Sequence, residues 1–307
     1  MMIPFSAAVI GAGAIGATLD QPGAALPLTH AGGYRACGFD LVLLIDPNPD
    51  ARRTATQWGC AVAADVEAIE KGKCPEVISV ATPTLVRASV LRQVLELGPR
   101  AVVAEKPLAA TASEAEAITK AYRAAGVPLL VNYSRRFTRI WQSLRGGDAM
   151  SATIRYGKGV RHNGTHAIDL CRMIFGECLD AQPLARKSDH WSDDPTVSAF
   201  LSFERCSEVF LQGLDERAFT LFEVDIVAPG WRLIVDSDGR RARRFELRDD
   251  VGIPPGKRLI EIGTEDTGAA SAMLNLMHNV RDILGGGAPQ CCGEDAVAAQ
   301  LVAERLS

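Results

Sequence analysis

Two side chains of this sequence are well suited to moving a proton. Lys106 follows Glu105 at the end of the apolar run 101–104, where a charged pair is costly unless it is used, and His166 lies in a predicted helix. A free lysine has a pKa near ~10.4 and needs burial or a neighbouring cation to act as a base at neutral pH, whereas the pKa of histidine lies near ~6.5. Lys106 could orient and polarise the oxygen of a hydroxyl group that is being oxidised while His166 takes its proton, or these roles could be exchanged. The residues themselves leave this division of roles open.

Polar residues around these two are candidates for contacting a substrate. Asp169 follows His166 by three residues, so the two share one face of the predicted helix. Asp169 could fix the imidazole or contact substrate hydroxyls, or it could simply favour the dipole at the start of the helix. His162 and Asn163 precede the helix. Arg135 follows another apolar run and could hold an anionic group or form an ion pair where two domains meet.

A glycine pattern near the start indicates dinucleotide binding. The motif G-x-G-x-x-G stands directly after the apolar run 7–10. In a strand followed by a helix, its first glycine permits a tight turn, its second lets a pyrophosphate approach the backbone, and its third lets the helix pack on the strand. The N–H groups at the start of that helix meet the anion. The expected cofactor-binding residues of this turn are Gly11, Gly13, Ala14, Ile15 and Gly16.

Asp46 is the acid expected to bind the cofactor ribose. It closes the apolar run 41–45, somewhat further from the glycines than the usual spacing of about 20 residues, because prolines and glycine within 20–33 are expected to interrupt the first helix. A carboxylate there accepts hydrogen bonds from the ribose 2′-hydroxyl and repels a 2′-phosphate by several kcal/mol at ~4 Å and an effective dielectric near ~20. This favours NAD, although the neighbouring Arg52 and Arg53 leave NADP open. Asp46 could also merely form a turn before the proline that follows it.

The first half of the chain alternates between short apolar runs and helical stretches, which predicts a doubly wound parallel sheet, the Rossmann arrangement. The expected strands are 7–10, 41–45, 77–80, 101–104 and 129–131. The expected helices are 49–58, 65–71, 84–97 and 113–125. Because ligands bind at the carboxyl ends of strands in such sheets, we expect Thr82, Pro83, Glu105 and Lys106 to lie beside the cofactor.

In the second half, strand candidates follow one another with few helices between them, which predicts an α+β domain with a mostly antiparallel sheet. The expected strands are 151–156, 196–203, 208–213, 219–228, 231–236 and 241–247. The expected helices are 137–144, 166–175, 267–284 and 293–306. We therefore expect a dinucleotide-binding domain over residues 1–133 and a domain for substrate binding and oligomerisation over residues 134–307.

Composition excludes several classes of protein. A chain of 307 residues with 47% hydrophobic and 23% charged residues is ordinary for a globular protein, and its net charge of −4 gives no basic field for nucleic acid. The eight cysteines form no C-x-x-C pair and no zinc spacing, which predicts free thiols in a cytoplasmic protein. The uncharged residues 1–19 lack a basic start and contain glycines, so they predict a strand and turn rather than a signal peptide or membrane segment.

Four ordered motifs resemble the glucose–fructose oxidoreductase/inositol dehydrogenase (Gfo/Idh/MocA) family over essentially the whole chain. They are the glycine pattern at 11–16, Glu105-Lys106-Pro107, the segment 131–137, and the pattern G-x-H-x-x-D that begins at Gly164. The resemblance implies a Rossmann domain, a C-terminal domain with a large open antiparallel sheet, and NAD(P)-dependent oxidation or reduction of sugars and related polyols. It also implies oligomers built through the open sheet. We therefore expect a homodimer or a homotetramer, with an apolar sheet face to which Phe200, Phe210 and Phe222 contribute.

The resemblance also implies roles for single residues. Lys106 corresponds to the family's lysine that contacts the reacting hydroxyl and the nicotinamide ribose, and His166 corresponds to its catalytic histidine. The family often has an aspartate four residues before that histidine, where this chain has His162, so the usual aspartate–histidine relay is in doubt. Arg87 stands where many members have a histidine.

Two other functions are compatible with parts of the sequence. His162, His166 and Asp169 resemble two histidines and a carboxylate around a metal, but Gly164 disfavours one continuous ligand helix, and NAD-dependent redox chemistry needs no metal, so we expect none. A non-catalytic dinucleotide-binding sensor could share the fold, but Lys106 and His166 argue against it. Neither the substrate, which is expected to be a small sugar-like molecule, nor the direction of reaction follows from the sequence.

Overall fold

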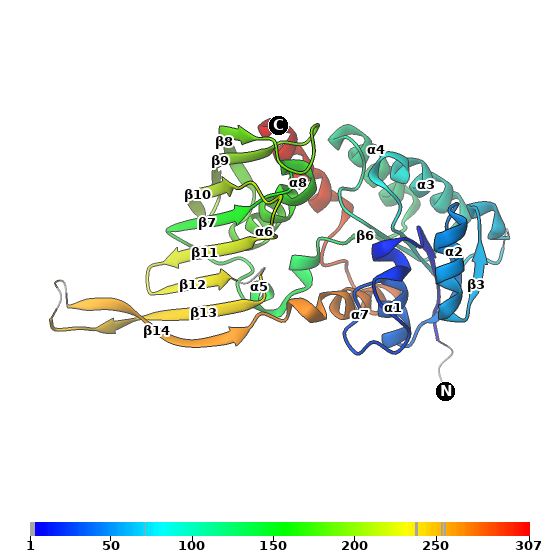
Figure 1. Cartoon of the computed structure of the whole chain (residues 1–307), viewed down its shortest axis with the longest axis horizontal. Helices are drawn as coiled ribbons and strands as arrows, with labels where there is room; N and C mark the ends of the chain where they lie inside the picture. The colour runs from blue at the N-terminus through cyan, green and yellow to red at the C-terminus, as the bar shows by residue number, and fades with distance from the viewer. Residues whose placement is uncertain (1–3, 71, 237–238, 253, 255) are drawn as a thin grey trace. The chain divides into compact units, whose positions relative to one another are not determined.

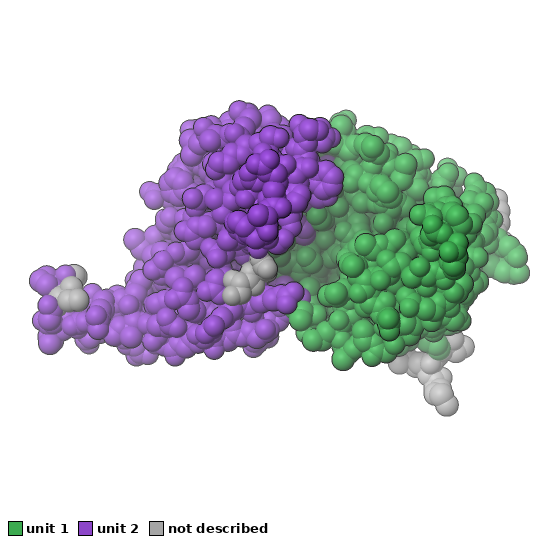
Figure 2. All heavy atoms as spheres, viewed as in Figure 1, with its two compact units in different colours: residues 1–137, 270–298 green, residues 138–269, 299–307 purple. Residues whose placement is uncertain are grey.

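The computed structural model describes residues 4–307 apart from 71, 237–238, 253 and 255. The chain divides into two compact units (Figure 2), the first with residues 1–137 and 270–298 and the second with residues 138–269 and 299–307. The sequence-based boundary lies between residues 133 and 134 and leaves all later residues in the second domain, whereas the structure groups 270–298 with the first unit. None of the described helices is long and apolar enough to cross a membrane.

The first unit is built around a parallel sheet of six strands (Figure 1). These are β1 (Ser6–Ile10), β2 (Asp40–Ile45), β3 (Ala61–Ala63), β4 (Val77–Val80), β5 (Ala101–Ala104) and β6 (Leu129–Val131), in the order β3-β2-β1-β4-β5-β6. Strands β4, β5 and β6 are buried along their whole length, which explains why their sequences are apolar apart from Ser79. The order reverses between β1 and β4, the place where dinucleotides bind in such sheets. The doubly wound sheet is confirmed, and β3 is a strand that the sequence did not indicate.

Most helices of the first unit lie where they were expected. They are α2 (Pro49–Ala55), α3 (Thr84–Leu97), α4 (Ala112–Ala125) and α7 (Ala272–Leu284), and α8 (Gly293–Leu306) begins in this unit. The helix expected at 65–71 is wrong, because the structure has only a short 3-10 turn at Val66–Ala68. Helix α7 packs closely on α1 (His30–Ala36), since a Cβ on Gly33 would lie only 2.9 Å from side-chain atoms of Met273 and Met277.

The helix after β1 is interrupted. A π-helical turn, Ala14–Thr18, begins within the glycine pattern, and α1 begins only after a loop. The Asp20 carboxylate closes this loop: it accepts hydrogen bonds from the backbone N–H groups of Leu28 (2.5 Å) and Thr29 (3.0 Å) and from the Thr29 hydroxyl (2.5 Å). The Thr29 hydroxyl oxygen accepts in turn from a backbone N–H of the first turn of α1 and caps that helix.

The second unit contains a sheet of eight strands in the order β14-β13-β12-β11-β7-β10-β9-β8 (Figure 1). All neighbouring pairs are antiparallel except β7 and β10. The strands are β7 (Ser151–Tyr156), β8 (Cys178–Lys187), β9 (Thr196–Phe203), β10 (Cys206–Gly213), β11 (Phe222–Ala228), β12 (Trp231–Asp236), β13 (Arg241–Asp249) and β14 (Lys257–Asp266). The expected mostly antiparallel sheet is confirmed, and the two edge strands β8 and β14 are additions to it.

One face of this sheet is buried and the other is more exposed. Burial alternates along β9, β10 and β11, and every residue of α6 (Thr165–Phe175) is buried. Phe200 and Phe210 contact each other edge to face at 5.1 Å, and Phe210 is 40% exposed. Phe222 is only 2% exposed and lies on the buried face together with Val224, two residues further along β11. Its expected contribution to the open face is therefore wrong.

Candidate active site

The glycine turn has three positions with different requirements. Gly11 has a φ of +94°, and a Cβ on it would lie 2.7 Å from backbone atoms of Ala81. A Cβ on Gly16 would lie 1.8 Å from the carbonyl oxygen of Gly11. A Cβ on Gly13, in contrast, would have no described protein atom within 4 Å. The fold itself therefore requires Gly11 and Gly16, whereas Gly13 borders open space in which a pyrophosphate can reach the backbone.

Ala14 and Ile15 open the π-helical turn at Ala14–Thr18. Backbone N–H groups in the first turn of a helix have no carbonyl partner within that helix, and they attract anions. The Gly13 carbonyl oxygen accepts the N–H groups of Ala17 (2.9 Å) and Thr18 (3.1 Å), which fixes the turn. The segment is thus suited to a phosphate although its helix is short.

Asp46 follows β2, as expected for the ribose-binding acid. One of its carboxylate oxygens accepts the backbone N–H of Asn48 at 2.9 Å, so the residue also forms the turn that was the simpler alternative. The two nearby arginines are both engaged: Arg52 donates to the carbonyl oxygens of Asp46 and Pro47, each at 2.8 Å, and Arg53 pairs with Asp50 at 2.8 Å. Neither guanidinium is held in place for a 2′-phosphate.

Thr82 and Pro83 follow β4, next to Gly11. The Thr82 hydroxyl is buried and has no hydrogen-bond partner among the described residues, which is costly unless a ligand supplies one. Arg87, buried on α3, donates to the carbonyl oxygens of Thr82 (2.5 Å) and Pro107 and so joins the segments that follow β4 and β5. Burial lowers the pKa of Arg87 to about 10, an effect that the nearby Glu105 opposes, and the side chain stays cationic at neutral pH.

Glu105 and Lys106 follow β5. Lys106 is half-buried and is joined to Pro107 by a cis peptide bond. One Glu105 oxygen accepts from the side chains of Asn132 (2.6 Å) and His30 (3.0 Å), and the other accepts from the backbone N–H of Lys106 (3.3 Å). Burial raises the pKa of Glu105, but the hydrogen bonds from His30 and Asn132 and the positive charge of Lys106 outweigh it, so this pKa lies below its ordinary value. Glu105 is therefore a buried carboxylate anion beside Lys106.

In the second unit, His162 and Asn163 belong to a π-helical turn, Val160–Gly164, that leads into α6. The Asn163 amide donates to the carbonyl oxygen of Gly157 at 3.0 Å. The His162 backbone N–H donates to the buried carboxylate of Asp194 at 2.8 Å, and its exposed ring stacks on Trp191 with centroids 4.8 Å apart. Trp191 is 44% exposed and thus presents apolar surface beside the turn, a feature that the sequence did not indicate.

His166 and Asp169 lie in α6 and are both buried, with Asp169 only 1% exposed. Their spacing places them on the same face of this helix. A carboxylate at this depth is costly without partners, so a role limited to a solvent-exposed interaction with the helix dipole does not account for it. An imidazole and a carboxylate on one buried helix face form a pair suited to binding a hydroxyl group.

The two arginines that follow β6 differ in environment. Arg136 is buried and forms an ion pair with Asp295 at 3.0 Å, and it also donates to the carbonyl oxygen of Gln290 at 3.2 Å. Arg136 therefore has a structural role, but its ion pair lies within the first unit and does not join two domains as the alternative expected. Arg135 is half-buried and remains the candidate of the two for contact with an anionic group.

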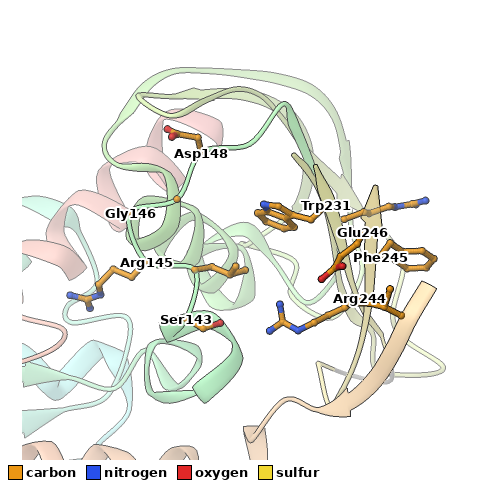
Figure 3. A pocket seen from close by; sticks show the side chains of 12 residues that line it. Ser143, Arg145, Gly146, Asp148, Trp231, Arg244, Phe245 and Glu246 are labelled. Carbon is orange, nitrogen blue, oxygen red and sulfur yellow. The ribbon is translucent and has the colours of Figure 1, made fainter. Parts of the chain in front are cut away.

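A separate cavity of about 450 Å³ lies within the second unit, between the loop 143–148 and strands β12 to β14 (Figure 3). Trp231, Arg244 and Glu246 point from the sheet toward the loop, whereas Phe245 points away from it. Arg244 is paired with Glu265, so its charge is already compensated. This cavity contains none of the residues that the sequence singled out.

The structure thus gathers the predicted residues in two groups. The first group follows four strands of one parallel sheet, at the ends where cofactors bind. It consists of Gly11 to Gly16, Asp46, Thr82-Pro83 and Glu105-Lys106. His162, Asn163, His166 and Asp169 follow one another in the second unit. Among the described residues, no group of three or more histidine, cysteine, aspartate or glutamate side chains is arranged to hold a metal ion.

Comparisons with known proteins agree with this arrangement. Residues 5–133 match GFO_IDH_MocA, the oxidoreductase family with an NAD-binding Rossmann fold. The chain is 24% identical to D-apiose dehydrogenase of Paraburkholderia graminis, over 84% of this chain and 77% of that protein.

Two solved structures share the fold over nearly the whole chain. One is an oxidoreductase from Agrobacterium radiobacter in complex with NAD+, L-tartaric acid and magnesium, with a TM-score of 0.78, 15% identity, and coverage of 98% of this chain and 95% of that one. The other is UDP-N-acetylglucosamine 3-dehydrogenase from Acidithiobacillus ferrooxidans, with a TM-score of 0.76, 18% identity, and coverage of 99% and 97%.

The open space at Gly13, the acid after β2 and the Thr82 hydroxyl, which has no partner within the part of the chain that the structure describes, fit a dinucleotide. The strand order is that of a Rossmann fold, and the matching family model describes an NAD-binding one. Residues 5–133 thus match the NAD-binding domain of the Gfo/Idh/MocA family of oxidoreductases, as the motifs predicted.

Proposed function

We propose that this protein moves a hydride between NAD and the hydroxyl-bearing carbon of a sugar, a sugar derivative or a polyol. The observation that carries the proposal is the half-buried Lys106, two residues after the end of β5, in a sheet whose neighbouring strand ends carry the dinucleotide-binding features. The names of two similar proteins, a D-apiose dehydrogenase and a UDP-N-acetylglucosamine dehydrogenase, support a sugar-like substrate.

Lys106 and His166 are the proposed catalytic pair. Bound NAD would supply the acceptor for the hydride that leaves when the hydroxyl-bearing carbon is oxidised to a carbonyl group. The hydroxyl proton must go to a base, a task that either a lysine or a histidine can perform. In the reductive direction the same groups return the proton. His162, Asn163, Asp169 and Arg135 are proposed to contact the rest of the substrate.

The proposed cofactor preference is NAD over NADP. Asp46 places a carboxylate after β2, and the guanidinium groups of Arg52 and Arg53 are occupied by backbone carbonyls and by Asp50. A 2′-phosphate would meet an acid whose nearest cations are already engaged, so its repulsion is weakly compensated.

The test is a panel of aldoses, polyols and nucleotide sugars, followed by the formation of NADH. On an identified substrate, Lys106→Ala and His166→Ala should each lower kcat by roughly 10²–10⁴, the loss typical of acid–base catalysis. Lys120→Ala, which removes an exposed lysine paired with Glu116, is the matched control and should leave kcat unchanged. Full turnover by either single variant would remove that residue from the pair, and NAD binding without turnover of any panel member would favour the sensor.

We also propose that the open sheet face forms a homodimer or a homotetramer. Phe200 and Phe210 give this face an exposed aromatic contact, and sizeable apolar patches on soluble proteins commonly mark interfaces. The cytoplasmic location stays a prediction from the sequence.

A further inference from the structure

The first unit contains a buried histidine, His30, that the proposed chemistry does not use and that contacts Glu105, the residue before Lys106. His30 on α1 is fully buried and uses both ring nitrogens. Its Nδ1 lies 2.9 Å from the hydroxyl oxygen of Ser79 on β4, and its Nε2 lies 3.0 Å from a carboxylate oxygen of Glu105. The hydroxyl of Tyr34, one turn further along α1, lies 2.7 Å from the same Ser79 oxygen.

The directions of these hydrogen bonds follow from the chemistry of the groups. An ionised Glu105 can only accept, so His30 Nε2 must carry a proton and donate it. Ser79 can then donate to His30 Nδ1 while it accepts from the Tyr34 hydroxyl. Burial raises the pKa of Tyr34, so its hydroxyl stays protonated and can act as this donor. Every polar hydrogen in this series of hydrogen bonds, from Tyr34 through Ser79 and His30 to Glu105, thus has an acceptor while Glu105 keeps its negative charge.

Hydrogen bonds from several elements also fix the position of the Glu105 carboxylate. Asn132, which follows β6, donates to the Glu105 oxygen that accepts from His30, and the Lys106 backbone N–H donates to the other oxygen. Donors from α1, from the segment after β6 and from the peptide of Lys106 itself therefore hold the carboxylate. Two cationic side chains interact electrostatically with Glu105. The charge of Lys106 lowers the pKa of Glu105, and the charge of Glu105 raises the pKa of Arg87. A buried anion beside these groups favours whatever positive charge a ligand brings to the same strand ends.

We propose that His30 is a positioning residue: it holds the Glu105 carboxylate ionised and in place, so that its charge favours the oxidised, cationic nicotinamide and orients the peptide of Lys106. This inference rests on the proposed function, because it assumes that the nicotinamide lies at the carboxyl ends of β4 and β5. The charge of Glu105 then stabilises NAD+ relative to NADH, and the loss of His30 weakens this preference. His30 acts through Glu105 and does not itself contact the substrate.

The experiment compares dissociation constants for NADH, from its fluorescence, and for NAD+, by competition, in the full chain. His30→Leu should raise the ratio Kd(NAD+)/Kd(NADH) on the order of tenfold, and Glu105→Gln should do the same. The double variant should be no worse than the poorer single variant, because both changes disable one unit. The amide of His30→Gln can still donate to a carboxylate, so the ratio of this variant should lie between the wild-type value and that of His30→Leu.

Tyr34→Phe is the matched control, since it removes a buried hydroxyl from the same helix and chain but leaves the contact between His30 and Glu105 in place. It should leave the ratio within about twofold of the wild-type value, while its melting temperature falls as for any lost buried hydrogen bond. If His30→Leu does not fold, His30→Gln and Glu105→Gln carry the test. A wild-type ratio in folded His30→Leu or in Glu105→Gln overturns the inference.

The readout separates this inference from the proposed function. The ratio needs no substrate, so it can respond to His30 even if no sugar is turned over. Conversely, Lys106→Ala can abolish turnover of a sugar while His30→Leu leaves the ratio unchanged, and then only the inference about His30 fails.

Discussion

Replacement of Gly13 by alanine separates cofactor binding from folding more sharply than any other change in the glycine turn. Gly13 has a φ of −72°, which an alanine adopts without strain, and a Cβ there would have no described protein atom within 4 Å. The free energy of unfolding should therefore change by no more than about 0.5 kcal/mol. The added methyl group would occupy the space that the pyrophosphate needs, so the Kd for NADH should rise at least about tenfold, or ~1.4 kcal/mol.

Gly16→Ala is the matched control, because the same methyl group would meet protein instead of ligand. Its Cβ would lie 1.8 Å from the Gly11 carbonyl oxygen, so the turn must move, at a typical cost of about 1–3 kcal/mol. Thermal unfolding and NADH fluorescence titration of both variants measure the two effects. A Gly13→Ala protein with wild-type melting and wild-type affinity for NADH would refute the position assigned to the pyrophosphate.

The remaining predictions concern cofactor choice, acid stability, assembly and thiol reactivity. Asp46→Ser should lower the preference for NAD over NADP measured by paired titrations, and a wild-type protein that binds NADP more tightly would contradict the ribose assignment. Because the pKa of Glu105 is lowered on folding, its stabilising contribution should be complete above the unfolded value near ~4.3 and should be lost as the pH falls below it; Glu105→Gln should flatten this acid limb in melting curves. Phe210→Asp should lower the mass measured by light scattering, and a monomeric wild-type protein at micromolar concentration would exclude the interface. Burial and a neighbouring aspartate raise the pKa of Cys292 to about 12, so its reaction with a thiol reagent at neutral pH should be slow, and rapid labelling would contradict its burial.

The fold could be predicted where one physical requirement dominates the residue pattern. Strands β4, β5 and β6 are buried on both faces, so their sequences are apolar apart from Ser79, and their bounds agree with the expectation. Strand β8 was missed because it is an edge strand with mostly exposed residues and no apolar run or alternation. The place of α7 was missed for another reason: chain order suggested the second domain, whereas the contacts that place it in the first unit, such as that of Met273 and Met277 with Gly33, link residues far apart in sequence.

The site could be predicted where chemistry leaves a local signature. The glycine turn, Asp46 and Lys106 each stand directly after an apolar run, so sequence position alone indicates a strand end. Trp191 and His30 lack such a signature, because their partners, His162 and Glu105, come from distant segments. Only the folded chain shows that these side chains belong with the predicted ones.

The interrupted first helix explains how His30 comes to serve the strand ends. An unbroken helix that starts at the glycine turn would place all its later residues along the one axis that begins at the phosphate. Here the π-helical turn Ala14–Thr18 ends early, and the Asp20 carboxylate gathers the loop back to Thr29, so that α1 starts anew with its own cap. The first residue of the restarted helix is His30, whose ring reaches β4 and the segment after β5 at the same time. Asp20→Ala should therefore lower stability and shift the NAD+/NADH affinity ratio in the direction of His30→Leu, although the Asp20 carboxylate bonds to Leu28 and Thr29 rather than to Glu105. A loss of stability with an unchanged ratio would show that α1 keeps His30 in place without the loop.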